Sequence, residues 1–311
     1  MSTLLWWDAA AVRAALSWPA AVAALRDALR GGLDPEAEPA RTATPFGAGE
    51  LLTMPSTGAR YAGVKLATVA PAGVPRIQGV YVLFDAASLA PVALLDGPAL
   101  TALRTPALSA LGVDLLAPTE AHRLVVFGSG PQAHGHVHAL RAVRPVDSVV
   151  LVGRDPGHLA ALIDRLAAEG VTARAGRPAE VADADLVVCA TSSPQPVFPG
   201  RLLSPDAVVV ACGSHHPDRR ELDADAFRGR GVLVESVTAA GREAGDVIKA
   251  VAAGALRPAE LVPLAGLVRG ATDARPRVFK TVGMGWQDLV LADAVVAAGD
   301  IGGTPAYEAN R

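Results

Sequence analysis

The stretch HRLVVFGSGPQAHGHVHAL, residues 122–140, predicts a buried strand, a glycine turn and the start of a helix. The apolar run over 124–127 is the strand. Gly128, Gly130 and Ala133 follow it with the G-x-G-x-x-G/A spacing of a dinucleotide-binding turn. The first glycine makes the tight turn, the second lets the backbone approach a pyrophosphate, and the small third residue lets the helix pack on the sheet. The N–H groups and positive dipole end of the helix then face the pyrophosphate. Plain tight turns also contain Gly-x-Gly, but the strand and helix on either side favour nucleotide binding.

The composition indicates a globular chain of about two domains. Its 311 residues are 51% hydrophobic and 19% charged, which is enough apolar surface to bury large cores. A net charge of −3 and a pI near 6.2 give no general attraction to nucleic acid or to an anionic membrane. No apolar run reaches the ~18 residues of a membrane span. No basic residue precedes Arg13, so we do not expect a signal peptide. We expect a cytoplasmic protein. Cys189 and Cys212 lie in apolar runs and predict small buried side chains without a disulfide framework.

The chain before the glycine turn predicts one module of helices and strands. Asp8 and Ser17 are candidate N-caps of two helices, the first over 9–16 and the second ending at the Gly31-Gly32 pair. Residues 34–48 predict an irregular connection. Strands are expected at 49–55, 60–69, 78–85 and 90–96, and their Gly, Pro, Asp and Ser boundaries favour a mostly antiparallel meander. Residues 97–118 predict a long amphipathic helix interrupted by Pro106.

From His122 onward, strands and helices alternate. Strands are expected at 123–127, 148–152, 185–190, 207–212 and 231–235, and helices at 131–143 and 156–169. This alternation predicts an α/β fold with a Rossmann-type, doubly wound parallel sheet. A late strand over 277–283 is expected to close the sheet, and an amphipathic helix over 287–299 to pack back on the first module. The predicted domains are therefore 1–117 plus 287–311, a mostly antiparallel α+β domain, and 118–286, a dinucleotide-binding domain.

The residues after the second strand of the parallel sheet bear on the choice of cofactor. NAD-preferring folds place Asp or Glu there, about 20 residues after the glycine turn, to bind the ribose 2′-OH. Here Gly153 takes that position and Arg154 follows, a residue able to pair bidentately with a 2′-phosphate. NADP(H) is therefore favoured. The alternative is that Arg154 is a solvated loop residue and that Asp155 binds the ribose of NAD(H).

The chain resembles the ornithine cyclodeaminase/μ-crystallin family over nearly its whole length. The residues that carry the resemblance are Met54-Pro55, Lys65, LTALRTPALSAL (100–111), FGSGPQA (127–133), ADADLVVCATSS (182–193), GSHHPDRREL (213–222) and VFKTVGMGWQD (278–288). The resemblance implies a homodimer whose first module binds the substrate and forms the dimer interface. It also implies that Ser129, Gln132 and Thr191 help the glycine turn to hold the cofactor.

The same resemblance implies a site for the carboxylate of an amino or imino acid at Arg41, Lys65 and Arg104. The chemistry agrees, because a small carboxylate needs a bidentate partner and Arg supplies one with fixed geometry. Lys65 alternates with apolar residues in GVKLATV, and Arg104 lies on an otherwise apolar helix face. Lys65 is expected to act in catalysis as well as binding. The alternatives are a salt bridge or surface position for Lys65 and a solvated loop charge at Arg41.

One departure from the family concerns the reaction itself. Ornithine cyclodeaminases carry an aspartate, thought to transfer protons, where this chain has His215. A histidine can move protons near neutral pH but offers no fixed anionic charge to a cationic substrate amine. The μ-crystallin-like members also lack the aspartate, and they resemble reductases of cyclic ketimines. The departure therefore favours a reductase with His215 as a catalytic residue, and His216 is a weaker candidate beside it.

Two further groups of residues carry weaker signals. His134, His136 and His138 form an H-x-H-x-H run, of which only His134 and His138 share a helix face. No nearby Cys, Asp or Glu in the sequence completes a ligand set, so no metal is expected. Asp288 begins the last helix, where a capping role and a direct role at the site are both open.

The sequence thus predicts an NAD(P)-dependent oxidoreductase acting on C–N bonds, with a cyclic imino acid such as Δ1-pyrroline-2-carboxylate as the favoured substrate. Ornithine cyclodeaminase and an alanine-dehydrogenase-like enzyme are the enzymatic alternatives. A non-catalytic NADP-dependent ligand-binding protein is the alternative of another class. We expect two partners, a small amino or imino acid and a second copy of the chain. We expect no binding to nucleic acid or to a membrane.

Overall fold

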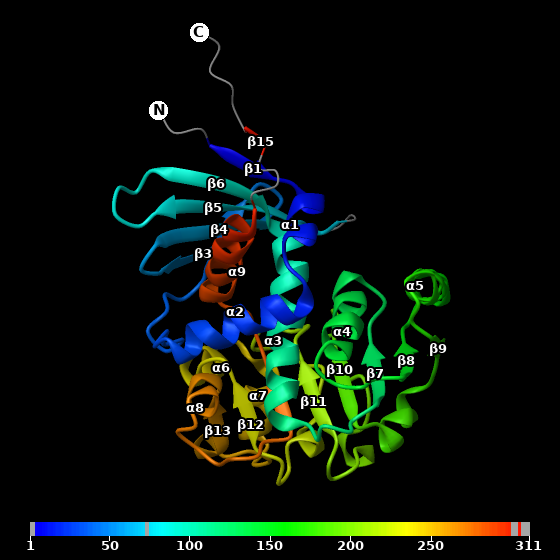
Figure 1. Ribbon diagram of the computed structural model, residues 1–311. Coiled ribbons are helices and arrows are strands. Elements are labelled where there is room, and N and C mark those ends of the chain that lie inside the picture. Colours follow the sequence, from blue (N-terminus) through cyan, green and yellow to red (C-terminus); the bar gives the residue numbers. More distant parts are fainter. Residues whose placement is uncertain (1–3, 72–74, 300–303, 306–311) are drawn as a thin grey trace. The chain divides into compact units, whose positions relative to one another are not determined.

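The computed structural model describes residues 4–71, 75–299 and 304–305, and these residues form two compact units (Figure 1). Unit 1 comprises the described residues within 1–28, 37–104 and 284–311, and unit 2 comprises 29–36 and 105–283. The boundary therefore falls inside a helix, after Arg104, whereas the sequence pattern places it after residue 117. Residues 29–36 also belong to unit 2.

Unit 1 contains a seven-stranded sheet in its described part, with the order β15-β1-β6-β5-β4-β3-β2. The strands β3 (Gly49–Thr57), β4 (Tyr61–Val69), β5 (Ile77–Asp85) and β6 (Pro91–Asp96) form the predicted antiparallel meander. The prediction of an irregular connection over 34–48 was wrong in part, because β2 (Thr42–Phe46) adds an exposed edge strand to β3. β1 (Leu5–Trp7), which was not predicted, pairs in parallel with β6, and β15 (Thr304–Pro305) pairs with β1.

The first two helices of unit 1 form where their caps predict. α1 (Ala9–Ala15) follows Asp8, whose carboxylate accepts the N–H groups of Ala10 and Ala11. α2 (Trp18–Arg30) follows Ser17, and its last residues belong to unit 2. The C-terminal helix α9 (Gly285–Ala298) packs on β3 and β4, as predicted. It is not the amphipathic helix that was expected, because residues 285–289 are buried on every side. The helix and the strand are so close that a Cβ at Gly285 would lie 2.5 Å from the carbonyl oxygen of Pro55.

The helix α3 (Gly97–Leu116) corrects two expectations. It continues through Pro106 instead of being interrupted there, and residues 103–113 are all buried, so it is a core helix rather than an amphipathic one. A helix buried on every side is stabilised by packing, which outweighs the one backbone hydrogen bond that proline removes. By length and composition α3 could cross a membrane, and 78% of its most apolar window is buried inside the fold.

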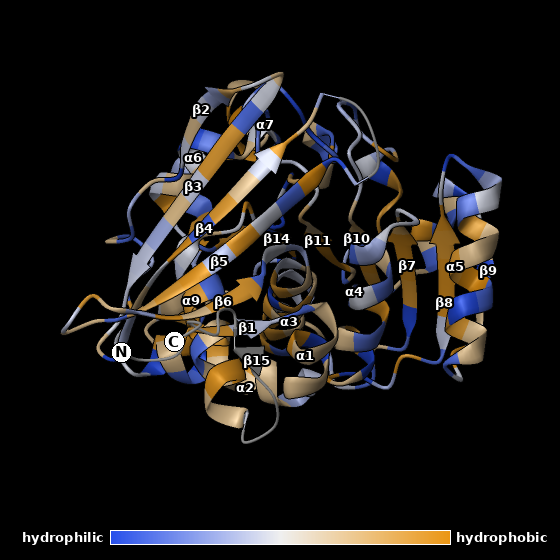
Figure 2. Cartoon of the chain, turned by 90° about the horizontal axis from the view of Figure 1, so that it is seen from above, coloured by the Kyte–Doolittle hydropathy of each residue, from blue (hydrophilic) through white to orange (hydrophobic). Residues whose placement is uncertain are grey.

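Unit 2 contains an eight-stranded sheet with the order β13-β12-β14-β11-β10-β7-β8-β9. Every strand pairing among its described residues is parallel. The predicted strands are β7 (Arg123–Phe127), β8 (Ser148–Val152), β10 (Leu186–Cys189), β11 (Val208–Ala211) and β12 (Val232–Val234). The central strands are buried along nearly their whole length and are coloured as hydrophobic in Figure 2, as expected for a sheet with helices on both faces. The Rossmann-type prediction is confirmed.

The late strand does not close the sheet at an edge. β14 (Val278–Lys280) inserts between β11 and β12, while β9 (Ala173–Ala175) and β13 (Leu261–Pro263) form the edges. The three-residue edge strands are too short to give a periodic signal, so they were missed.

The remaining helices of unit 2 connect these strands. α4 (Pro131–Arg141) and α5 (Pro156–Ala168) lie where they were predicted, and α6 (Val237–Glu243), α7 (Gly245–Ala252) and α8 (Leu264–Val268) follow later. Short 3-10 turns occupy Pro178–Asp183, Gly200–Leu202, Ala224–Ala226 and Pro258–Glu260. Cys189 is buried as expected, and Cys212 is half-buried; neither forms a disulfide among the described residues.

Candidate active site

In unit 1 a buried lysine faces the C-terminal helix. Lys65 lies in the middle of β4, directly opposite Met54 on β3 and Tyr81 on β5. Buried residues alternate along β4, and Lys65 takes one of the buried positions with 4% exposure. A strand alternates its side chains between two faces, so the pattern that buries Tyr61 and Ala67 also buries this ammonium group. A charge buried in this way requires partners.

The partners come from α3 and from the start of α9. The Nζ of Lys65 donates to the Oδ2 of Asp288 at 2.8 Å and to the Oγ1 of Thr101 at 3.4 Å. The Nε of Arg104 lies 3.8 Å from the Oδ1 of Asp288, and its Nη1 donates to the Oε1 of Gln287 at 2.9 Å. Asp288 is fully buried and is not the N-cap of α9, which is Met284. Asp288 is therefore part of a charge cluster, and its capping role is excluded.

Two further charged groups act on this cluster. Burial, opposed by Asp288 and reinforced by Arg104 and Arg41, lowers the pKa of Lys65 to about 8. Burial likewise raises the pKa of Glu38, against hydrogen bonding to Ser56 and to the backbone of Trp286. Arg41 and Arg104 are thus both close enough to Lys65 to act on it electrostatically, and Asp288 opposes them.

Tyr81 is a polar group of this region that the sequence did not single out. Its hydroxyl is buried and has no hydrogen-bond partner among the described residues. Burial raises the pKa of Tyr81, and the charges of Asp288 and Glu38 raise it further. Its ring lies against Gly63, where a Cβ would stand 2.2 Å from the tyrosine oxygen.

The glycine turn of unit 2 has the geometry that a dinucleotide requires. Gly128 has φ +127°, and a Cβ there would lie 2.5 Å from the carbonyl oxygen of Ala190 at the end of β10. Gly130 is the N-cap of α4, with no side-chain cap, and a Cβ added to it would meet nothing within 4 Å. Ala133 is fully buried in the first turn of α4. The first glycine is therefore required by the fold, whereas the second leaves open the approach to the N–H groups of α4.

This turn lies at the point where the strand order reverses. The chain runs outward through β7, β8 and β9 on one side, and continues from β10 on the other. Ligands of doubly wound sheets bind outside the carboxyl ends of the strands at this reversal. Ser129 is half-buried and lies beside Gly153, which follows β8. The residues of the turn therefore fit a bound dinucleotide.

Of the two candidate residues for the ribose, Asp155 is engaged within the fold and Arg154 is not buried. Asp155 is the N-cap of α5, and its Oδ1 accepts the N–H of His158 at 2.8 Å, a bond that lowers the pKa of Asp155. Arg154 is exposed. A Cβ at Gly153 would make only ordinary contacts, 3.4 Å from Leu159 at the nearest, so the fold does not by itself require glycine there.

Thr191 follows β10, but its polar groups are engaged within unit 2. Its N–H and its hydroxyl both donate to the Oε1 of Glu221 at 2.7 Å. The other oxygen of Glu221 accepts the N–H of Gly213, also at 2.7 Å. Glu221 thereby joins the ends of β10 and β11, a buried contact that no local pattern in the chain indicates.

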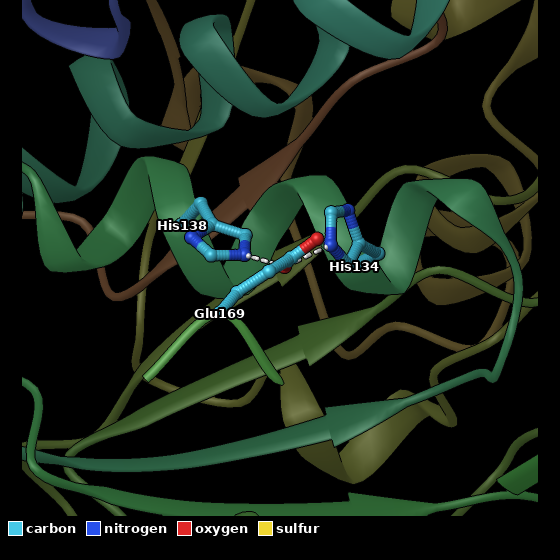
Figure 3. A group of neighbouring side chains, drawn as sticks. All are labelled: His134, His138 and Glu169. Carbon is cyan, nitrogen blue, oxygen red and sulfur yellow. Dashed lines mark hydrogen bonds and ion pairs between the residues drawn. The ribbon is translucent and has the colours of Figure 1, made fainter. Parts of the chain in front are cut away.

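The predicted histidines fall in three places. His215 is half-buried after β11, and its ring lies 4.4 Å from that of the exposed His216. His136 is fully buried in α4 and contacts the hydroxyl of Ser109 at 2.9 Å. His134 and His138 share a face of α4, as predicted, and both contact Glu169 (Figure 3). The expectation that no acidic residue lies near them was wrong, because Glu169 reaches them from the end of α5.

Comparisons with known proteins identify the family of the chain. The model of the ornithine cyclodeaminase/mu-crystallin family matches residues 10–298. Delta(1)-pyrroline-2-carboxylate reductase 2 of Burkholderia ambifaria is 33% identical over 296 residues, which cover 91% of this chain and 92% of that protein. The ketimine reductase mu-crystallin of Mus musculus is 31% identical over 222 residues, covering 71% and 70%.

Among solved structures, the fold is similar to that of Thermococcus litoralis Delta(1)-pyrroline-2-carboxylate reductase in complex with NADH and L-proline. The TM-score is 0.88 at 23% identity, with 95% of this chain and 97% of that chain covered. The family match and the sequence identity assign the family, and the solved structure shows the same fold. The chain belongs to the ornithine cyclodeaminase/mu-crystallin family.

Proposed function

We propose that the protein is an NAD(P)H-dependent reductase that converts a cyclic imino acid of the Δ1-pyrroline-2-carboxylate type to the corresponding amino acid. The observation that carries the proposal is the buried pair of Lys65 and Arg104 beside Asp288, with the half-buried Arg41 close enough to act on Lys65. The name of the Burkholderia relative, a Delta(1)-pyrroline-2-carboxylate reductase, supports the substrate class.

Arg104 is suited to hold the substrate carboxylate. Gln287 fixes one Nη and Asp288 lies beside Nε, so the planar guanidinium is oriented before a ligand arrives. A carboxylate then meets a prepared fork and loses little further side-chain entropy. Lys65 and Arg41 add positive charge. Holding the ligand in a single orientation supplies part of the catalytic effect, because two reactants must meet in a defined geometry.

Reduction of a C=N bond requires a hydride at carbon and a proton at nitrogen. When bound, the reduced nicotinamide supplies the hydride. Lys65 supplies the proton in this proposal, because a pKa of about 8 keeps the ammonium charged at neutral pH yet makes the loss of its proton easy. His215 is the alternative donor, because histidine side chains transfer protons efficiently near neutral pH.

The glycine turn at Gly128–Ala133, with Ser129 and Gln132, is proposed to hold the pyrophosphate. We also propose a preference for NADPH. Arg154 is exposed after β8, and Asp155 is already occupied as the cap of α5, which leaves the arginine as the residue able to meet a 2′-phosphate. Thr191 remains a candidate for the cofactor through its remaining oxygen lone pairs.

A homodimer is proposed through the face of the unit 1 sheet opposite α9. Val64, Val82 and Leu94 form a row of aligned cross-strand neighbours on that face, and they are only half-buried in one chain. A row of apolar side chains on three adjacent strands favours burial against a second copy. Light scattering is expected to give twice the mass of the chain for the wild type and the single mass for Val82→Lys. A wild-type monomer would contradict the dimer.

The test of the reaction is a spectrophotometric assay with Δ1-pyrroline-2-carboxylate and NADPH or NADH. We expect steady oxidation of the cofactor and one proline formed per nicotinamide consumed. Arg104→Ala should abolish turnover while cofactor binding is retained, and Arg60→Ala, an exposed arginine of the same unit, should leave both unchanged. Ammonia and proline formed from ornithine without net cofactor change would instead identify a cyclodeaminase. Cofactor binding without any turnover would identify a binding protein.

A further inference from the structure

A group of possible metal ligands lies on the surface of unit 2, outside the residues proposed for substrate and cofactor. His134 and His138 project from adjacent turns of α4, and Glu169 directly follows α5 (Figure 3). The Nε2 atoms of the two histidines lie 2.6 and 2.7 Å from the same carboxylate oxygen, Oε2 of Glu169. Three donor atoms from two separate helical segments therefore converge on one point.

Neighbouring residues keep these three side chains in place. The side chains of His134, His138 and Glu169 are 15%, 21% and 35% exposed, so they are ordered by packing yet open to solvent. Arg165, one turn earlier on α5, donates through Nε to the other oxygen of Glu169 at 3.2 Å. A hydrogen bond of this kind orients a ligating carboxylate, as the outer partners of metal sites do.

We propose that His134, His138 and Glu169 bind a divalent transition-metal ion, with Zn²⁺ as the best match. Two imidazole nitrogens and one carboxylate oxygen are ligands that Zn²⁺ uses, with a water in the fourth position. Mg²⁺ and Ca²⁺ prefer oxygen ligands and are not expected to bind. The histidines are four residues apart on one helix, the spacing that places two side chains on the same face.

The donor atoms need only a small rearrangement to accept the ion. All three lie within 4.8 Å of one another. Bonds of 2.0–2.1 Å in a tetrahedral site place ligand atoms roughly 3.4 Å apart. The carboxylate must therefore withdraw from each nitrogen by less than about 1 Å, and the two nitrogens must approach each other by up to about 1.4 Å. Glu169 is the most exposed of the three and can make this movement by side-chain rotation. The ion would then tie the first turns of α4 to the end of α5.

The experiment is a titration of the chelator-treated full-length protein with ZnCl₂, followed by calorimetry and by the thermal midpoint. CoCl₂ serves as a spectroscopic probe, because tetrahedral Co²⁺ absorbs in the visible. We expect one ion per chain, a higher thermal midpoint with Zn²⁺, and no response to MgCl₂. His138→Gln and Glu169→Gln should each weaken Zn²⁺ binding at least tenfold, and His134→Ala/His138→Ala should abolish it.

The matched control is His158→Gln, which removes one exposed histidine from α5 and leaves the three ligands in place. It should bind Zn²⁺ like the wild type. Circular dichroism of each variant shows whether loss of binding comes from loss of the fold. Binding that persists in His134→Ala/His138→Ala, or an absence of binding to the folded wild type at millimolar Zn²⁺, would overturn the proposal.

Discussion

Asp288→Asn tests whether the buried carboxylate organises the cation cluster of unit 1. The substitution keeps the size of the side chain but removes the charge that faces Lys65 at 2.8 Å and Arg104 at 3.8 Å. Removal of one partner from a buried ion pair costs about 3–5 kcal/mol, because the remaining charge stays buried without compensation. We expect a loss of this size in the free energy of unfolding.

The two cations contribute differently to that loss. Lys65 can lose its proton, and since its pKa is about 8, doing so at pH 7 costs only about 1.4 kcal/mol, which limits its share. Arg104 cannot deprotonate, so the remainder of the penalty falls on it. The variant should also lose activity at neutral pH, because Asp288 is the group that keeps the pKa of Lys65 up. In the wild type, kcat/KM should fall as the pH rises through about 8, and in the variant this limb should move to lower pH, to about 7 or below.

The assays are urea unfolding and a pH profile of kcat/KM. The control is Asp293→Asn on the same helix, whose carboxylate pairs with an exposed Arg60 at 3.5 Å and is expected to contribute less than about 1 kcal/mol. A double variant, Asp288→Asn/Lys65→Met, should recover part of the stability but no activity, because it removes the uncompensated ammonium. An Asp288→Asn protein within about 1 kcal/mol of the wild type, with its basic limb unmoved, would refute the reasoning.

Three other predictions concern unit 2. Arg154→Ala should raise the KM for NADPH by roughly 10–100-fold and leave that for NADH unchanged, since a charged hydrogen bond contributes about 1.5–3 kcal/mol; equal effects on both cofactors in steady-state kinetics would contradict this role. Gly130→Ala should leave the thermal midpoint nearly unchanged, because its Cβ meets nothing within 4 Å, while fluorescence titration shows cofactor affinity at least tenfold weaker; unchanged affinity would place the pyrophosphate elsewhere. Burial lowers the pKa of His136 to about 4, so the unfolded chain binds the extra proton first and stability should fall as the pH drops from 6.5 toward 4, by up to about 3 kcal/mol. Urea unfolding at several pH values measures this slope, and His136→Asn should flatten it.

Much of the architecture could be predicted because its signals are local. The strand, the turn and the helix around Gly128 follow within a few residues of one another, and the alternation after His122 indicates a parallel sheet. Asp8 and Ser17 begin their helices as expected. Prediction failed at Pro106, where packing keeps the helix continuous, and at the three-residue strands β1, β9 and β13, which are too short to give a periodic signal.

The sequence by itself determined that this chain has a glycine turn for a dinucleotide and, through its family resemblance, three candidate cations for a carboxylate. Tertiary structure alone decided what those cations face. Asp288 lies 223 residues from Lys65, and Gln287 lies 183 residues from Arg104. Periodicity reports which face of an element is buried, but not which distant element covers that face. For the same reason His134 and His138 could be placed on one helix face from the sequence, while only the fold brings Glu169 to them.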